Sequence, residues 1–408
     1  MSAVPVTALR AVTRRLAPGT WAAHPWRADP DVLFERDGWG FAGRGAALRV
    51  PAAVVASALA SFDVDDEVGA PGTGPVAFAA LPFAALPFDT LPFDTEAPAD
   101  FVVPAGLVVR SPGGGEWETV VDGVSIRADR PWGAEPDGFS LRSPVPHDRW
   151  EEAVAKAVSH IRLGDVAKVV LAREVLVEAN RPIVVPTVLR RLRALYPSCT
   201  TFLVDGFLGA SPEVLVARTG SAVRSRPLGG TRPHSGDPAV DAAQAALLLG
   251  SDKDRREHAV IVDAVAGILG PLCDRLDVPA TPSIVPLRNV LHLGTPIEGR
   301  LRTPAPTLLE LANLLHPTPA VGGAPREAAL ALIAQLEPTG RGRYAGPVGW
   351  VDRRGDGEMV LGIRSASIDG ARASMWAGVG VVVGSETAAE LAETQFKLQA
   401  LLAAIVRP

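Results

Sequence analysis

Apolar and polar positions follow two different periods along the second half of the chain. Residues 147–163 repeat apolar side chains at helical spacing and end at Gly164, whereas residues 166–177 form an apolar, β-branched run. The first pattern predicts an amphipathic helix and the second predicts a strand. The same reasoning predicts further helices over residues 186–196, 251–276, 304–315, 325–335 and 387–406, and further strands over residues 201–208, 348–351, 359–368 and 371–383.

The first half of the chain is richer in proline, glycine and alanine. Residues 101–110 alternate as antiparallel strands do, with a turn at residues 113–115. The triplet Leu-Pro-Phe occurs three times within residues 81–93, at a period too short for a solenoid, and predicts an irregular insertion. We therefore expect a mostly-β portion over residues 1–145 and a second portion over residues 146–408, integrated into one fold.

Long helices combined with runs of neighbouring strands predict the α+β class rather than a doubly wound sheet. The net charge of −5 gives no electrostatic support for a nucleic-acid partner. Cys199 and Cys273 are isolated, which fits a reducing compartment and excludes a disulfide framework. No apolar run approaches the length of a membrane span or resembles a secretory signal, so we expect a cytoplasmic protein.

Lysine is scarce, because only four of the 40 basic residues are lysines: Lys156, Lys168, Lys253 and Lys397. Arginine stays protonated, whereas a desolvated lysine can lose its proton and act as a base. Lys168 lies in the predicted strand over residues 166–177, and Lys397 lies on the closing helix, four residues after a glutamate. A strand lysine that extends to solvent is the alternative for Lys168.

Two predicted helices each begin with a pair of carboxylates. Glu390 and Glu393 share a face of the last helix with Lys397, and Asp254 and Glu257 open the helix at residue 251. Thr387 and Ser251 are the expected caps of these helices. Four carboxylates could converge on a hard cation such as Mg²⁺. The same spacing is also typical of solvent-exposed ion pairs and of helix-dipole stabilisation.

Three further segments carry polar groups in turns or loops. Glu213 follows a Ser-Pro pair, and a lysine base with a glutamic acid would suit an addition–elimination reaction. The loop at residues 226–232 includes Gly230 and Thr231, whose N–H groups could bind a carboxylate. Residues 377–384 superficially resemble a dinucleotide loop, but the glycines run through a strand pattern, which favours close approach to a small anion. Structural turns are the alternative for Glu213 and for the loop at residues 226–232.

Taken in order, these segments resemble those of the chorismate-utilising enzymes, and isochorismate synthases most closely. The resemblance covers roughly residues 146–405 and also extends to anthranilate synthase component I and salicylate synthase. It rests on Lys168-Val-Val-Leu-Ala-Arg173, Gly209-Ala-Ser-Pro-Glu213, Pro227-Leu-Gly-Gly-Thr231, Lys253-Asp-Arg-Arg-Glu-His258, Leu291-His-Leu-Gly294, His316-Pro-Thr-Pro-Ala-Val-Gly-Gly323, Gly342-Arg-Tyr-Ala-Gly346, Gly362-Ile-Arg364, Ala377-Gly-Val-Gly380 and Glu390-Leu-Ala-Glu-Thr-Gln-Phe-Lys397.

The resemblance implies large antiparallel sheets flanked by helices and a magnesium-dependent isomerase that acts on chorismate. Lys168 would be the general base that activates water for attack at C2, and Glu213 the general acid that protonates the departing C4 hydroxyl. Glu257 and Glu393 would hold Mg²⁺, with Asp254 and Glu390 nearby through water. The ligands that the resemblance implies for the substrate are Tyr344 and Arg364 for the enolpyruvyl carboxylate, Lys397, Gly230, Thr231, Gly378 and Gly380 for the rest of the anion site, and His292 near the metal and ring.

Three positions distinguish the branches of the family. Lys168 stands where anthranilate synthase has Gln, which favours water over ammonia and removes the need for a glutamine amidotransferase subunit. Gly229 stands where the aminodeoxychorismate branch has a nucleophilic lysine, and we expect its difference from the more usual Ala to have little effect. Residues 316–323 resemble isochorismate synthases, with salicylate synthase as the main enzymatic alternative. A binding-only or nucleotide-binding protein is the alternative of another class.

We expect a monomer whose partner is the small molecule chorismate, with no nucleic-acid or membrane partner. The product would feed menaquinone, siderophore or other aryl-acid biosynthesis, and the sequence leaves this choice open. It also assigns no function to the Leu-Pro-Phe insertion.

Overall fold

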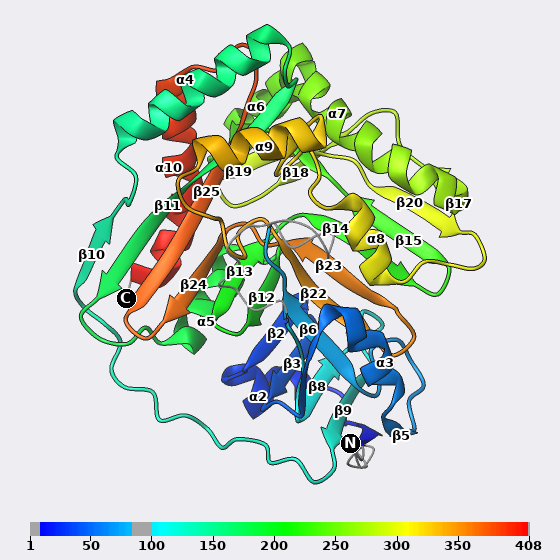
Figure 1. Cartoon of the computed structure of the whole chain (residues 1–408). Helices are drawn as coiled ribbons and strands as arrows, with labels where there is room; N and C mark the ends of the chain where they lie inside the picture. Colours follow the sequence, from blue (N-terminus) through cyan, green and yellow to red (C-terminus); the bar gives the residue numbers. More distant parts are fainter. Residues whose placement is uncertain (1–8, 84–99, 407–408) are drawn as a thin grey trace, which may run out of the picture.

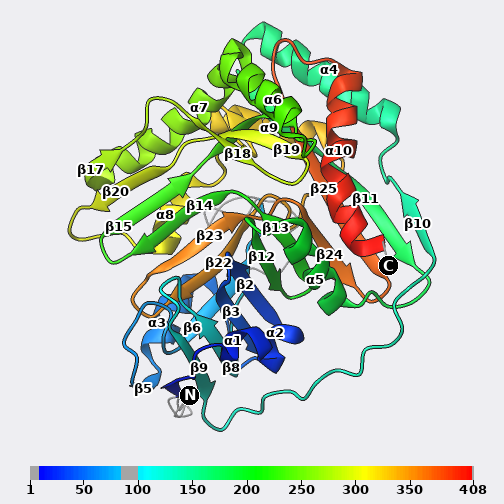
Figure 2. The same ribbon diagram turned by 180° about the vertical axis from the view of Figure 1, so that it is seen from behind.

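Two large β-sheets face each other at the centre of the molecule, and helices cover their outer sides (Figures 1 and 2). The computed structural model describes residues 9–83 and 100–406. Most of the Leu-Pro-Phe segment therefore lies outside the described residues. Among the described residues, no helix is long and apolar enough to cross a membrane.

The first large sheet holds the strand that bears Lys168, and the described part of it contains 13 strands. All of its pairings are antiparallel except that between β1 and β5. In spatial order its strands are β10 (Phe139–Arg142), β11 (Lys168–Ala179), β25 (Arg372–Val381), β24 (Ser365–Asp369), β13 (Phe207–Ser211), β12 (Thr200–Val204), β2 (Val32–Arg36), β3 (Trp39–Arg44), β8 (Gly106–Arg110), β9 (Glu116–Val121), β1 (Arg10–Arg15) and β5 (Asp63–Asp66), with β21 (Gly323–Ala324) against β11.

The second large sheet has nine strands in the described residues, and a third sheet has three. The second runs β17 (Cys273–Asp277), β20 (Ile297–Leu301), β15 (Ala222–Arg226), β14 (Val214–Thr219), β23 (Gly357–Leu361), β22 (Pro347–Asp352), β6 (Val76–Ala80), β7 (Asp100–Val103) and β4 (Leu48–Pro51). The third runs β16 (Leu228–Pro233), β19 (Val290–Gly294) and β18 (Ser283–Pro286). The antiparallel α+β architecture that we predicted is therefore the one observed.

Ten α-helices are present in the described part of the chain. They are α1 (Thr20–Ala23), α2 (Pro25–Ala28), α3 (Val55–Ala60), α4 (His147–Leu163), α5 (Val185–Leu195), α6 (Pro238–Gly250), α7 (Asp252–Leu269), α8 (Leu308–Leu315), α9 (Arg326–Leu336) and α10 (Thr387–Val406). Two short 3₁₀ turns occupy Ala52–Val54 and Gly270–Leu272. The predicted bounds of the helix over residues 147–163 are those of α4, and Gly164 ends it at φ 86°.

Both large sheets mix strands from the two halves of the chain. β2 pairs with β12 in the first sheet, and β6 pairs with β22 in the second. Between the sheets, aromatic side chains such as Phe34, Phe41, Phe78 and Trp350 form one buried cluster. A second buried cluster contains apolar side chains of α5 and α10, which pack on the outer face of the first sheet. A third contains side chains of α3 and α8, which pack on the outer face of the second sheet. The apolar area removed from water in these layers fixes the sheets that carry the site.

Two strand predictions were wrong in the same way. Residues 201–208 form two strands, β12 and β13, because Asp205 and Gly206 adopt positive φ values in a tight hairpin turn. Residues 359–368 likewise divide into β23 and β24, which belong to different sheets. The break falls at residues 362–364, where Arg364 has a φ of 50°.

Three predictions about helix ends were also wrong. The helix expected over residues 304–315 is α8, which begins at Leu308 because Thr307 caps it. The helix expected over residues 251–276 is α7, which ends at Leu269 because Gly270 and Pro271 follow it, and β17 then begins at Cys273. Ser251 caps α7 as predicted, because its Oγ accepts the N–H of Asp254 at 3.2 Å. Thr387 is the first residue of α10 rather than its cap.

Candidate active site

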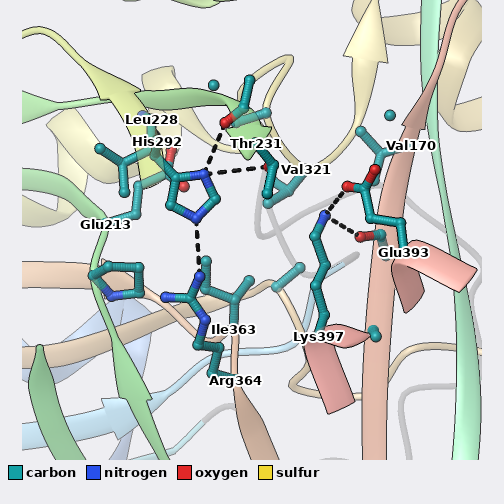
Figure 3. Close-up of a pocket in the computed structure, with 18 of the residues that line it drawn as sticks. Val170, Glu213, Leu228, Thr231, His292, Val321, Ile363, Arg364, Glu393 and Lys397 are labelled. Atoms are coloured by element: carbon teal, nitrogen blue, oxygen red, sulfur yellow. Dashed lines mark hydrogen bonds and ion pairs between the residues drawn. The ribbon is translucent and has the colours of Figure 1, made fainter. Parts of the chain in front are cut away.

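A pocket of about 160 Å³ lies where β11, β25, α7 and α10 meet. It brings together predicted site residues that are up to 229 positions apart in sequence. Those that line it are Lys168, Glu213, Gly230, Thr231, Glu257, His292, Tyr344, Arg364, Gly378, Gly380, Glu390, Glu393 and Lys397. Figure 3 shows ten of the pocket residues with labels, among them His292, Arg364 and Lys397.

Lys168 and Glu257 form an ion pair in this pocket. Lys168 begins β11 and is 4% exposed, and its Nζ donates to Oε1 of Glu257 on α7 at 2.8 Å. Burial alone would raise the pKa of Glu257, but the charge and hydrogen bond of Lys168 outweigh it and lower the pKa. The pair keeps the Glu257 carboxylate ionised and ties α7 to the sheet. Lys168 does not extend to solvent.

Glu213 occupies the link between β13 and β14, where the chain passes from the first large sheet to the second. Its side chain is 5% exposed, and Oε1 accepts the N–H of Leu228 at 3.4 Å. Burial raises the pKa of this carboxyl to about 7, against smaller opposing effects of Leu228, Lys168 and Arg364. Glu213 can therefore carry a proton at neutral pH, as a general acid must.

His292 and Arg364 form a second polar contact across the pocket (Figure 3). Nη2 of Arg364 lies 2.9 Å from Nε2 of His292, and Nδ1 of His292 lies 2.8 Å from the carbonyl of Gly230. A guanidinium only donates and a carbonyl only accepts, so the imidazole is neutral with its proton on Nδ1. Burial and the charge of Arg364 lower the pKa of His292 to about 3, in agreement with a neutral ring.

Arg364 has unused capacity to bind an anion. Its Nη1 is buried and has no hydrogen-bond partner among the described residues. The residue also holds a φ of 50°, in the left-handed region that side chains other than glycine rarely adopt. A strained backbone that presents an unpaired guanidinium nitrogen to a pocket suits recognition of a carboxylate.

Lys397 bridges α10 and β25. Its Nζ donates to Oε1 of Glu393 at 2.8 Å and to the carbonyl of Gly378 at 2.9 Å, as the dashed lines in Figure 3 mark. Burial would lower the pKa of Lys397, but the adjacent Glu393 carboxylate outweighs it and raises the pKa. Burial and the neighbouring Glu393 charge raise the pKa of Glu390, which lies one turn earlier. Glu390, Glu393 and Lys397, which were predicted from their spacing to share one face of α10, thus form one wall of the pocket.

Glycines in β25 leave the space that these lysines occupy. A Cβ at Gly380 would lie 2.8 Å from Cε of Lys168, and a Cβ at Gly378 would lie 3.2 Å from Oη of Tyr344. Tyr344 is buried, which raises its pKa, and it stacks on Trp376 with ring centroids 6.0 Å apart. Both glycines lie inside a strand rather than before a helix, so they do not form a dinucleotide loop.

The carboxylates suit a hard cation, although they are not gathered around one point. Glu257, Glu390 and Glu393 are oxygen donors on two helices that line one pocket. Among the described residues, no three acidic, histidine or cysteine side chains are close enough together to hold a metal ion as they stand. Glu257 and Glu393 are each paired with a lysine instead. A cation would have to replace those ammonium partners.

Asp254 is the one predicted site residue outside the pocket lining. Its Oδ2 lies 3.8 Å from Nη2 of Arg232, and its Cβ lies 3.1 Å from where a Cβ at Gly230 would stand. Gly230 has a φ of 61°, so both backbone conformation and space favour glycine there. Asp254 thus supports the loop behind the pocket wall.

Sequence analysis missed two charged residues of the pocket, Lys253 and Arg341. Lys253 lies on α7 one turn before Glu257, so three of the four lysines of the chain line this pocket. The scarcity of lysine was the signal that could have found it. Arg341 is held by Glu337 through its Nε at 2.8 Å, and no sequence pattern that we weighed pointed to that pair.

Gly229 is more constrained than we expected. A Cβ there would lie 3.0 Å from Nδ1 and 3.2 Å from Cα of His258, the residue after Glu257 on α7. The β16 strand and α7 therefore approach so closely that an alanine requires a small shift of the helix. In this chain, Gly229 sets the distance between the segment at residues 226–232 and α7, the helix that carries Glu257.

The comparisons with known proteins agree with this geometry. The profile of the family described as "Chorismate binding enzyme" matches residues 127–406. The chain belongs to this family of chorismate-binding enzymes. The isochorismate synthase DhbC of Bacillus subtilis (strain 168) is 42% identical to it over 273 residues, which are 64% of this chain and 68% of that protein. The vibriobactin-specific isochorismate synthase of Vibrio cholerae serotype O1 is 36% identical over 314 residues, 76% of each chain.

The fold is shared with a solved member of the family. The structure of MenF, the menaquinone-specific isochorismate synthase from Escherichia coli, aligns with a TM-score of 0.81 over 97% of this chain and 94% of that one. Sequence identity in this alignment is 24%, so the alignment shows a shared fold and nothing further. The predicted chorismate-binding fold, with large antiparallel sheets flanked by helices, is confirmed.

We predict that Gly380→Ala displaces the Lys168 side chain without unfolding the protein. The added methyl group would lie 2.8 Å from the flexible end of Lys168 and 3.0 Å from Oε1 of Glu257. Misplacement of a reacting group by about 1 Å can lower a rate roughly a hundredfold. Measured kcat/KM on chorismate should therefore fall at least about tenfold, with little change in Tm. Gly384→Ala is the matched control, because no atom lies within 4 Å of its added Cβ.

We also predict that Glu213→Gln changes the pH dependence of stability. Between its ordinary pKa of 4.5 and its folded value of about 7, Glu213 keeps a proton that the unfolded chain has released. Its contribution to stability is complete below 4.5 and is lost as pH rises through about 7. The difference in unfolding free energy between Glu213→Gln and the parent should grow over this window, by on the order of a few kcal/mol. The measurement is urea denaturation of both proteins from pH 5 to 8. If the unfolding free energies of the two proteins change equally with pH over this range, the raised pKa of Glu213 is contradicted.

Proposed function

We propose that the chain is a magnesium-dependent isochorismate synthase, an isomerase that converts chorismate to isochorismate. One observation carries the proposal. A lysine and a glutamic acid that can be protonated at neutral pH, Lys168 and Glu213, line the same pocket. A base and an acid in one pocket suit addition of water coupled to loss of a hydroxyl. Similarity to relatives named isochorismate synthase supports the same reaction.

In this proposal Lys168 is the general base. It removes a proton from water, whose oxygen then forms a bond to C2 of the ring while the ring double bonds shift. To accept that proton the ammonium group must first be neutral, so its hydrogen bond with Glu257 must be released. Its place in the same pocket as Glu213, and its burial away from bulk water at 4% exposure, support this role.

Glu213 is the general acid on the other side of the reaction. It donates its proton to the C4 hydroxyl, so that the C4–O bond breaks and water departs. One water enters and one leaves, and the product has the mass of the substrate. The pKa of about 7 supports this role, because the acid is then protonated in part at neutral pH.

The remaining pocket residues bind and orient the substrate. Arg364 offers its unpartnered Nη1 to the enolpyruvyl carboxylate, and Tyr344 offers its hydroxyl. His292, which is neutral, holds the Arg364 side chain and the Gly230 carbonyl in place. The predicted anion-site residues are Lys397, Gly230, Thr231, Gly378 and Gly380.

Glu257 and Glu393 would hold Mg²⁺, with Glu390 and Asp254 behind them. The cation would supply positive charge beside the ring carboxylate of the substrate. Carboxylate oxygens on two helices are the donor type that magnesium prefers, which supports the assignment. Mg²⁺ and the two carboxylates of the substrate carry equal and opposite charge, so their joint binding would leave the net charge of the pocket unchanged.

We further propose that the chain acts without a glutamine amidotransferase subunit, because Lys168 serves water rather than ammonia. Its product would enter menaquinone or siderophore biosynthesis, and the relatives include enzymes named for both. A monomer remains our prediction.

The activity itself is tested by incubation of the purified protein with chorismate and Mg²⁺, followed by chromatography and mass spectrometry. We expect a product of unchanged mass and new retention time that disappears in the presence of EDTA. Salicylate with pyruvate would instead assign the salicylate synthase reaction. Binding of chorismate without any product would refute both activities.

We predict that Lys168→Gln and Glu213→Gln each lose at least about a hundredfold in kcat, because each removes one proton-transfer group. Glutamine at residue 168 can still donate a hydrogen bond to Glu257, so α7 stays in place. Tm and chorismate affinity serve as the checks that the site is intact. Near-parental turnover in either variant would rule out the role given to that residue.

Glu393→Gln is expected to raise the Mg²⁺ concentration needed for half-maximal activity by roughly tenfold or more, because a neutral amide is a weak ligand for a hard cation. The measurement is a magnesium titration of the initial rate at saturating chorismate. Glu386→Gln is the matched control, since this exposed glutamate precedes α10 and lies outside the pocket lining. Identical titrations for parent and Glu393→Gln would remove Glu393 from the metal site.

A further inference from the structure

The strand that begins with Lys168 has an uncovered stretch on its outer edge. β21 pairs only with the first two residues of β11, and β10 pairs only from Leu176 onward. Between them, residues 171–175 have no strand partner on this edge within the described chain, whereas the N–H of Val170 still donates to the carbonyl of Gly322 at 2.9 Å. The N–H of Ala172 donates instead to Oε1 of Glu337 at 2.8 Å. A side chain in place of a neighbouring strand leaves space beside the sheet.

A second cavity of about 220 Å³ lies beside this uncovered edge. Helix α4, which packs against α10 in Figures 1 and 2, forms one wall, and residues 335–339, at the end of α9 and just beyond it, form another. Its apolar lining includes Trp150, Leu171, Leu336 and Trp376. Trp376 also lines the active-site pocket, so the two cavities share this side chain.

Arg173 places a buried positive charge on this cavity. The residue is 4% exposed, and its Nε donates to Oγ1 of Thr394 at 2.7 Å. Within the described chain this is the hydrogen bond that its guanidinium makes, and no carboxylate forms an ion pair with it there. Burial lowers its pKa. A buried guanidinium without a counter-charge is costly, which an anionic ligand would relieve.

The acidic residues around the cavity are already engaged. Glu337 pairs with Arg341 on the active-site side, and Glu174 accepts a hydrogen bond from Ser374. Glu152 on α4 pairs with Arg149 at the rim at 3.1 Å. Glu174 keeps its own charge, because a hydroxyl does not neutralise it, but none of these carboxylates forms an ion pair with Arg173 in the described chain. Lys156 on α4 adds a further cation to the lining.

We propose that this cavity is a second ligand site, which binds a small aromatic carboxylic acid as its anion. The guanidinium of Arg173 matches a carboxylate, and the two tryptophans offer flat walls for a ring. An apolar cavity of about 150 Å³ suffices for benzene, so about 220 Å³ admits a ring with a carboxylate. A few polar groups in a mostly apolar concavity are characteristic of small-molecule sites.

A ligand bound in this second cavity would alter the shape of the active-site pocket. Trp376 stacks on Tyr344, and Glu337, which holds Arg341, caps the strand edge between the two cavities. A ring packed against Trp376 would change the pocket that receives chorismate. The proposal concerns binding, so its main test does not depend on the reaction assigned above.

Benzoate is the probe, and isothermal titration calorimetry is the measurement. Parent protein should bind benzoate, and Arg173→Met should weaken that binding at least about tenfold, because a charge-assisted hydrogen bond is lost. Arg162→Met, which removes an exposed guanidinium of α4 outside the cavity lining, should bind as the parent does. If Arg173→Met does not fold, Ala153→Phe, which fills the cavity from α4, should abolish binding instead.

Three results would overturn the proposal. The first is no heat with the parent protein at millimolar benzoate. The second is binding that survives both Arg173→Met and Ala153→Phe and competes with chorismate, because benzoate would then occupy the active site. The third is equal affinity for inorganic phosphate, which would mean an anion site without an aromatic preference.

Discussion

The ion pair between Lys168 and Glu257 is the contact on which the site depends. It joins the first residue of β11 to the second turn of α7, 89 positions away, and the two side chains are 5% and 19% exposed. Charges in such a setting must be balanced, so every neighbour is constrained: Gly380 must leave room, and Lys397 and Glu393 form a second balanced pair. The pocket therefore holds two ion pairs, Lys168–Glu257 and Lys397–Glu393. Both would exchange partners when a substrate and a cation bind.

Burial affects the two proton-transfer groups differently. Lys168 has a carboxylate partner, whereas Glu213 has only a weak backbone contact, and burial raises its pKa to about 7. Their difference follows from position, since Glu213 lies where the chain leaves one sheet for the other and few polar groups reach it. Two groups with divergent environments are what acid–base chemistry at neutral pH requires.

Much of this could be predicted from the sequence, because several signals were local. The bounds of α4 followed from apolar periodicity and Gly164, and the face of α10 followed from the spacing of Glu390, Glu393 and Lys397. The hairpin at Asp205-Gly206 was missed although its turn residues were visible. What could not be predicted depends on tertiary packing: the lysine partners of the carboxylates, the close approach of His258 to Gly229, and the buried charge of Arg173.

The most direct test of the central claim is the fate of solvent oxygen. Chorismate is incubated with the protein and Mg²⁺ in heavy-oxygen water, and the product is fragmented in the mass spectrometer. Attack of a water activated by Lys168 and loss of the C4 hydroxyl predict one heavy oxygen, located at C2, in every product molecule. A product that retains the original oxygen would show transfer within the substrate and contradict the account.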